Sequence, residues 1–177
     1  MTFHKLARDG GSPVREEAWL DNHTAAEEEI HVATEVIRSG KLSGFEGSFD
    51  PTPGFSFWGG EQVQALENEW KDHLAISHAV SVNSATSGIL AALAALEVGP
   101  GDEVIVPCAT MTACAPLPLY FGAIPIFADI SADDGTIDPQ SIEKFLTERT
   151  KCVLVVHQYG FPADISAILN LAHKHNL

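Results

Sequence analysis

The sequence predicts an α/β domain in which a mostly parallel sheet is covered by helices on both faces. Short apolar runs alternate with helical patterns from Ala79 onward, and turn residues separate them. The runs are apolar at successive positions, as in strands that are buried on both faces. The 177 residues are enough for a real core, and the net charge of -14 argues against a broad nucleic-acid or anionic-membrane surface.

The first 60 residues differ in character from the rest. Residues 1–22 are polar and aperiodic, and we expect a flexible arm there. Residues 23–60 are expected to hold a helix and then an aromatic loop. Thr24 and Glu27 match a capping box for that helix. The irregular stretch 42–60 carries aromatic side chains that need a surface to pack on, which favours an ordered loop against a second subunit.

Residues 61–177 form the third predicted region, in which strands and helices follow in regular order. The predicted strands are 79–82, Glu103–Pro107, Ile124–Ala128 and 152–156. The predicted helices are 61–74, 87–96, 112–121, one that Asp138 caps and one that Asp164 caps. Because a βα unit has just finished at Leu177, we expect a fold truncated at its C-terminus, with a small standalone domain as the alternative.

The turn after the first predicted strand is a candidate anion site. In open parallel sheets, ligands bind at the carboxyl ends of the strands. Residues 83–87 read Asn-Ser-Ala-Thr-Ser and open a helix of small residues, whose unpaired N–H groups and hydroxyls suit a phosphate group. The alternative is that Asn83 or Ser84 merely caps the helix. The turn is neither a G-K-[ST] loop nor a G-x-G-x-x-G motif.

Two further candidates follow later strands. We interpret Met111 as a core methionine, and the alternative is a thioether packed on a flat ligand ring. We interpret His157 as a satisfied core histidine, and the alternatives are a hydrogen bond to a ligand or an acid-base role. His173 and His175 lie two residues apart and so do not share a helix face, and no metal site is expected.

The cysteines and the apolar stretches indicate the compartment. The three cysteines form no C-x-x-C pair and leave an odd count, which fits a reduced cytoplasmic protein. The N-terminus lacks the long apolar core of a signal peptide. The most apolar stretch, 113–130, contains three prolines and Asp129, so it does not predict a membrane span.

Several motifs, in order and well spaced, resemble the DegT/DnrJ/EryC1/StrS family of sugar aminotransferases. The most specific are Gly-Asp-Glu-Val-Ile-Val-Pro at 101–107 and Gly-Phe-Pro-Ala-Asp at 160–164. Others are Gly-Gly-Glu at 59–61, Ser-Ala-Thr-Ser at 84–87 and Gly-Ala-Ile-Pro at 122–125. Members are fold-type I enzymes that use pyridoxal 5'-phosphate. The resemblance implies that residues 61–177 are the N-terminal part of the large domain of a PLP-dependent transferase.

The resemblance also implies roles for the candidate residues. The positions that match Ser84, Ala85 and Thr86 bind the cofactor phosphate in such enzymes. Met111 stands where the family usually carries an aromatic ring stacked on the pyridine, and we count His157 among the expected cofactor contacts. The family's active sites form across a homodimer, so a homodimer is expected of the full-length protein.

The implied activity is amino transfer from an amino-acid donor, with glutamate expected, to a nucleotide-linked keto sugar, in the biosynthesis of amino sugars, polysaccharides or antibiotic sugars. The aspartate that pairs with the pyridine nitrogen and the Schiff-base lysine are both expected beyond Leu177. None of the lysines in this sequence matches the Schiff-base lysine. These lysines are Lys5, Lys41, Lys71, Lys144, Lys151 and Lys174. The 177 residues alone are therefore expected to be inactive. A non-catalytic or regulatory family member and a PLP-dependent sugar dehydratase remain alternatives.

Overall fold

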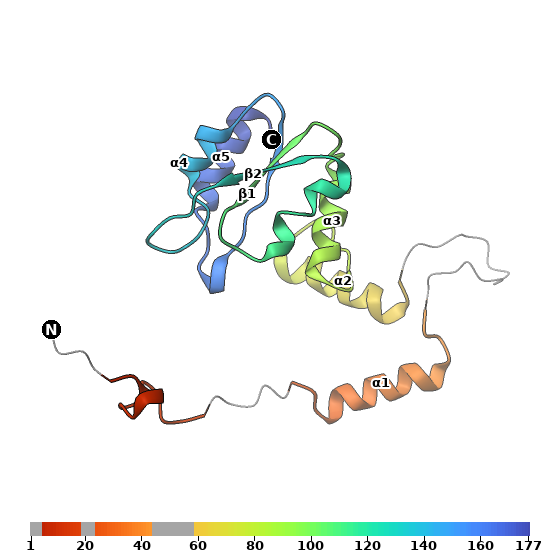
Figure 1. Ribbon diagram of the computed structural model, residues 1–177. Coiled ribbons are helices and arrows are strands. Elements are labelled where there is room, and N and C mark those ends of the chain that lie inside the picture. The colour runs from red at the N-terminus through yellow and green to blue at the C-terminus, as the bar shows by residue number, and fades with distance from the viewer. Residues whose placement is uncertain (1–4, 19–23, 44–58) are drawn as a thin grey trace, which may run out of the picture. The chain divides into compact units, whose positions relative to one another are not determined.

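The computed structural model describes residues 5–18, 24–43 and 59–177 (Figure 1). The chain divides into two compact units, Met1–Ala79 and Val80–Leu177. The predicted aromatic loop lies almost wholly outside the described residues, as do parts of the predicted arm. The first unit contains the 3-10 turn η1 and the helices α1 and α2, with the bounds Ala7–Asp9, Glu27–Ser39 and Glu61–Leu74.

Helix α1 begins at a different cap from the predicted one. The N-cap is Ala26, whose backbone N–H donates a hydrogen bond to Glu29 Oε2 at 2.7 Å. This bond lowers the pKa of Glu29. The prediction that Thr24 caps and Glu27 reaches back is therefore wrong. Three successive glutamates offer several registers, and the short motif cannot choose among them. Gly40 ends the helix with φ 69°, as glycine at this position commonly does.

The second unit is built on a three-stranded parallel sheet with the order β2-β1-β3. Its strands are β1 (Glu103–Pro107), β2 (Ile124–Ala128) and β3 (Thr150–Val153). Strands β1 and β2 match their predictions, and β3 begins two residues earlier than predicted and ends three residues earlier. Within the described residues no strand forms at 79–82, where Val80 and Val82 are exposed. An apolar run becomes a strand only where another strand pairs with it, and no described segment does so here.

Helical elements precede, connect and follow the strands. They are α3 (Ala85–Ala95), η2 (Thr112–Cys114), η3 (Pro118–Phe121), α4 (Pro139–Phe145), η4 (Gln158–Gly160) and α5 (Ile165–His175). The predicted helix 112–121 is wrong: two 3-10 turns form instead, because Pro116 and Pro118 have no N–H to donate to a helix. The aspartate caps are confirmed. Asp138 accepts a hydrogen bond from the Gln140 N–H and Asp164 accepts one from the Ala167 N–H, both at 2.9 Å.

The side chains of β1 alternate between two apolar cores, one on each face of the sheet. Val106 packs in one core with Leu93 of α3. Ile105 packs in the other with Ile142 of α4 and Ile168 of α5. Figure 1 shows α4 and α5 on one side of the sheet and α3 on the other. The predicted α/β class, a parallel sheet with helices on both faces, is confirmed. It places the loops after β1 and β3 at the same edge of the sheet.

Candidate functional site

The loops after β1 and β3 are joined at the carboxyl edge of the sheet. Thr110 Oγ1 donates a hydrogen bond to Gln158 Oε1 at 3.4 Å, across 48 positions of sequence. This bond ties the loop that carries Met111 to the loop that carries His157. Met111 is 73% exposed, so the core-methionine interpretation is wrong, and its thioether is accessible to a ligand.

The turn that opens α3 is held by its own hydroxyl groups. Ser84 Oγ accepts a hydrogen bond from the Ser87 N–H at 3.1 Å, and Ser87 Oγ donates one to Asn83 Oδ1 at 2.6 Å. The interpretation of Ser84 as a helix cap is therefore confirmed. A helix start leaves four N–H groups without intrahelical partners, and this cap takes up one of them. The N–H groups of Ala85 and Thr86 remain for an anion, and both residues are exposed.

The sequence around this turn carries no basic side chain. No lysine or arginine occurs between Lys71 and Lys144, so none comes from the sequence around the turn or from β1 and β2. The donors that remain are backbone N–H groups and hydroxyls, supported by the positive end of the α3 dipole. Capping and anion binding are compatible here, because they use different N–H groups.

His157 lies at the end of the segment that continues β3, and it is exposed rather than part of the core. Its Nδ1 accepts a hydrogen bond from the backbone N–H of Ala163 at 3.0 Å. The core-histidine interpretation is therefore wrong about the burial of His157. It is right that one ring nitrogen, Nδ1, has a hydrogen-bond partner within the protein. Because Nδ1 is an acceptor, the proton of the neutral ring lies on Nε2, which can donate at this edge.

Sequence reasoning assigned no role to three residues at this edge. Thr110 and Gln158 form the bond between the loops, and Tyr159 follows directly. Tyr159 has φ 50° and ψ 30°, in the left-handed region, and its side chain is 93% exposed. The available signal was positional, since all three residues follow predicted strands whose carboxyl ends share one edge.

The opposite end of the sheet holds a buried carboxylate. Glu103, at the start of β1, is 3% exposed. Thr147 Oγ1 donates a hydrogen bond to it, and Arg149 Nε donates another at 3.0 Å. The Thr147 hydroxyl, with help from the Arg149 guanidinium, lowers the pKa of Glu103 against the effect of burial. This cluster ties the start of β1 to the loop before β3, and we assign it a structural role.

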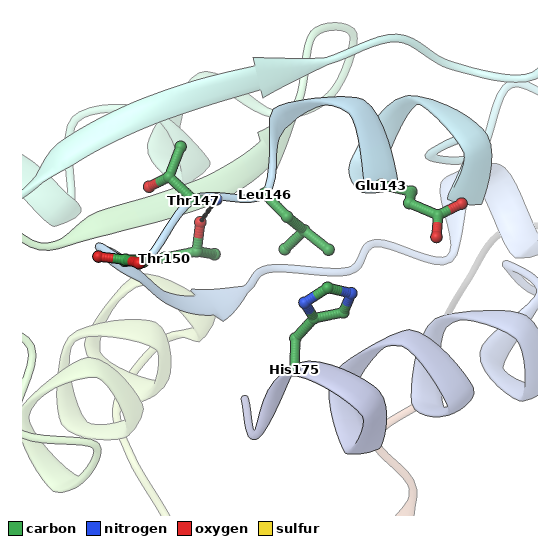
Figure 2. Close-up of a pocket in the computed structure, with 6 residues that line it drawn as sticks. Glu143, Leu146, Thr147, Thr150 and His175 are labelled. Atoms are coloured by element: carbon green, nitrogen blue, oxygen red, sulfur yellow. Dashed lines mark hydrogen bonds between the residues drawn. The ribbon is translucent and has the colours of Figure 1, made fainter.

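A pocket of about 450 Å³ also lies at this opposite end. Its lining residues are Glu143, Leu146, Thr147, Glu148, Thr150 and His175. Figure 2 shows the side chains of Leu146 and His175 directed toward one another, beside the hydrogen bond between Thr147 and Thr150. None of the predicted site residues lines this pocket.

Neither a metal-binding cluster nor a membrane-spanning helix is found in the described part of the chain. Within 5–18, 24–43 and 59–177, no group of three or more histidine, cysteine, aspartate or glutamate side chains could hold a metal ion. Among the helices of these residues, none has the length and apolar character needed to cross a membrane.

Known proteins resemble this chain over most of its length. UDP-N-acetyl-3-dehydro-alpha-D-glucosamine 3-aminotransferase of Acidithiobacillus ferrooxidans is 45% identical over 122 residues, which are 69% of this chain and 33% of that protein. The structure of an aminotransferase from Psychrobacter cryohalolentis gives a TM-score of 0.75 at 31% identity, covering 88% of this chain and 36% of the other.

A third similar structure was solved in a form that its name gives as the PLP form. The PLP form of a sugar aminotransferase, Spr1654 from Streptococcus pneumoniae, gives a TM-score of 0.72 at 31% identity, covering 85% of this chain and 34% of the other. The chain thus spans about a third of the length of the relatives it matches. The DegT/DnrJ/EryC1/StrS aminotransferase family matches residues 53–177, and the chain belongs to that family.

Proposed function

We propose that this chain provides the phosphate-anchoring part of a pyridoxal-phosphate-dependent aminotransferase. The whole protein would transfer an amino group from an amino-acid donor, with glutamate expected, to a nucleotide-linked keto sugar. The observation that carries the proposal is the Ser84-capped turn at the start of α3, with exposed Ala85 and Thr86. A relative named for aminating a nucleotide sugar and a relative solved in a PLP form support it.

The residues at this edge fit the cofactor's phosphate. The N–H groups of Ala85 and Thr86 and the Thr86 hydroxyl are donors that suit phosphate oxygens, and the α3 dipole favours negative charge. Small residues at the turn let the ligand approach the backbone closely. The bound cofactor supplies an electron-withdrawing ring that stabilises negative charge on the substrate carbon.

The other residues of the site would position the ring and exclude water from it. Met111 offers an exposed apolar thioether, which packs well on a flat ring. His157 is fixed by its bond to Ala163 and would donate a hydrogen bond through Nε2 to a polar atom at the same edge. Met111 and His157 would thus bind the cofactor ring and orient it. No lysine of the chain stands in the position of the family's Schiff-base lysine, so we expect no transamination from the 177 residues alone.

Two further features of the whole protein belong to this proposal. We infer a homodimer, because the resemblance implies that active sites form between two subunits. We also infer a cytoplasmic location, which agrees with a cysteine pattern that predicts no disulfide framework.

The proposal is tested by comparing two ligands that differ only in the phosphate. The chain is titrated with pyridoxamine 5'-phosphate and with pyridoxamine, and binding is measured by isothermal titration calorimetry. Neither ligand needs a lysine to bind. We expect the phosphate to strengthen binding by more than about tenfold, since charge-assisted hydrogen bonds to the turn are made only by the phosphate. Equal affinities, or no binding of the phosphate ligand, would overturn the proposal.

A further inference from the structure

We propose that Tyr159 is a specificity-determining residue of this site, and that its aromatic side chain contacts the ring of the phosphate-bearing ligand. The inference rests on the proposed function, because it takes the Ser84 turn as the phosphate anchor. It adds Tyr159 as a contact to the ligand ring, beside the contacts proposed for the turn and for Met111.

The backbone of Tyr159 is in a conformation that a bulky residue rarely adopts. Its φ of 50° and ψ of 30° lie in the left-handed region, which glycine and asparagine tolerate and tyrosine does not favour. The side chain is 93% exposed, so packing within the described residues does not compensate for the strain. Strained residues persist where the surroundings impose the conformation, and they cluster at ligand sites.

The residues around Tyr159 impose this conformation. On one side, His157 Nδ1 accepts the Ala163 N–H at 3.0 Å. Gln158 is held twice: its side chain accepts from Thr110 Oγ1 at 3.4 Å, and its carbonyl accepts from the Phe161 N–H at 2.9 Å. The loop is therefore pinned before and after Tyr159, and the aromatic ring is held away from the protein interior.

The same bonds bring two exposed side chains to one edge. Thr110 and Gln158 are hydrogen-bonded to each other. Met111 directly follows Thr110, and Tyr159 directly follows Gln158. Met111 is 73% exposed and Tyr159 is 93% exposed. A thioether and an aromatic ring both pack favourably on a flat ring. A planar ring whose phosphate lies on the α3 turn is the ligand class that this pair suits.

The test compares two probes on the wild-type chain and on three variants. The probes are pyridoxamine 5'-phosphate, which has a ring, and inorganic phosphate, which has none. Tyr159→Gly removes the ring and suits the left-handed backbone, while Tyr159→Phe keeps the ring. Tyr120→Ala is the matched control, since Tyr120 is also exposed but lies in η3, at the amino end of β2. Affinities come from calorimetry and Tm from circular dichroism.

The proposal predicts a split between the two probes. Tyr159→Gly should weaken pyridoxamine 5'-phosphate binding by about 3- to 10-fold and leave inorganic phosphate binding unchanged. It should also raise Tm by roughly 4 °C, because the strain is relieved. Tyr159→Phe and Tyr120→Ala should bind both probes as the wild type does.

Two results would overturn the inference without touching the proposed function. One is unchanged binding of pyridoxamine 5'-phosphate by Tyr159→Gly. The other is an equal loss for both probes, which would mean that Tyr159 only shapes the loop. A wild-type chain that binds neither probe would overturn the phosphate anchor and this inference together.

Discussion

The imidazole Nδ1 of His157 accepts a hydrogen bond from the backbone N–H of Ala163, at 3.0 Å. The acceptor role fixes the proton of the neutral ring on Nε2 and fixes the orientation of the ring. Ala163 is buried and directly precedes the cap of α5, so the bond also joins the end of the β3 segment to the start of that helix. One histidine thus has a structural nitrogen and a nitrogen that can meet a ligand.

His157→Ala should lower the free energy of unfolding by about 1 kcal/mol, because the buried Ala163 N–H loses its acceptor. His157→Asn should recover most of this loss, since its amide oxygen can accept from the same N–H. Urea denaturation of both variants measures the difference. Equal destabilisation by alanine and asparagine would mean that the hydrogen bond does not contribute. In the wild type, nitrogen NMR shifts of the ring should report the tautomer with the proton on Nε2.

Ser84 allows capping and anion binding to be separated by two substitutions. Ser84→Ala should cost about 1 kcal/mol of stability, because α3 loses its cap. Ser84→Asp should keep the stability, since aspartate caps as well as serine, but its carboxylate repels a phosphate. We therefore expect Ser84→Asp to melt like the wild type and to bind pyridoxamine 5'-phosphate more than about tenfold more weakly. Unimpaired binding by this variant would place the phosphate elsewhere.

The absence of lysine and arginine between Lys71 and Lys144 predicts an unusual salt dependence. A phosphate held by basic side chains is released as salt screens the attraction. Here the chain has a net charge of -14, so salt chiefly screens its repulsion of the anionic ligand. Affinity for pyridoxamine 5'-phosphate should stay constant or rise up to a few-fold between about 0.05 and about 0.5 M NaCl. Over this range the screening length falls from roughly 14 to roughly 4 Å. A steep fall with salt would indicate a basic site instead.

Glu103 predicts how stability depends on acid. Its pKa is lowered from its ordinary value of 4.5, chiefly by the Thr147 hydroxyl and then by Arg149. The stabilisation is therefore present above the ordinary pKa and is lost as pH falls through the lowered value. Glu103→Gln should cost about 1–2 kcal/mol at pH 7. Its urea midpoint should then fall less steeply than that of the wild type below pH 4.5, and parallel curves would contradict the assignment.

The sequence was sufficient for features that depend on neighbouring residues. The β1 and β2 runs and the caps at Asp138 and Asp164 are local signals, and the structure has all four. It was insufficient where the outcome depends on distant partners. The run 79–82 has the composition of a strand, but a strand needs a neighbour, and no described segment pairs with it.

The candidate site shows the same division. The Ser84 cap could be predicted from the residue types at a helix start. The exposure of Met111 and the bond between Thr110 and Gln158 could not, because they depend on two loops that are 48 positions apart in the sequence. The left-handed backbone of Tyr159 likewise follows from bonds to its neighbours and not from a tyrosine preference.

Amide NMR tests whether the Ser84-Ala85-Thr86 turn holds the cofactor phosphate. A ¹⁵N-labelled chain is titrated with pyridoxamine 5'-phosphate and then with inorganic phosphate. We expect the Ala85 and Thr86 amide signals to shift most with both ligands, and the amide signals of Met111 and its loop to shift only with pyridoxamine 5'-phosphate. Saturable binding that leaves the Ala85 and Thr86 amides unmoved would contradict it.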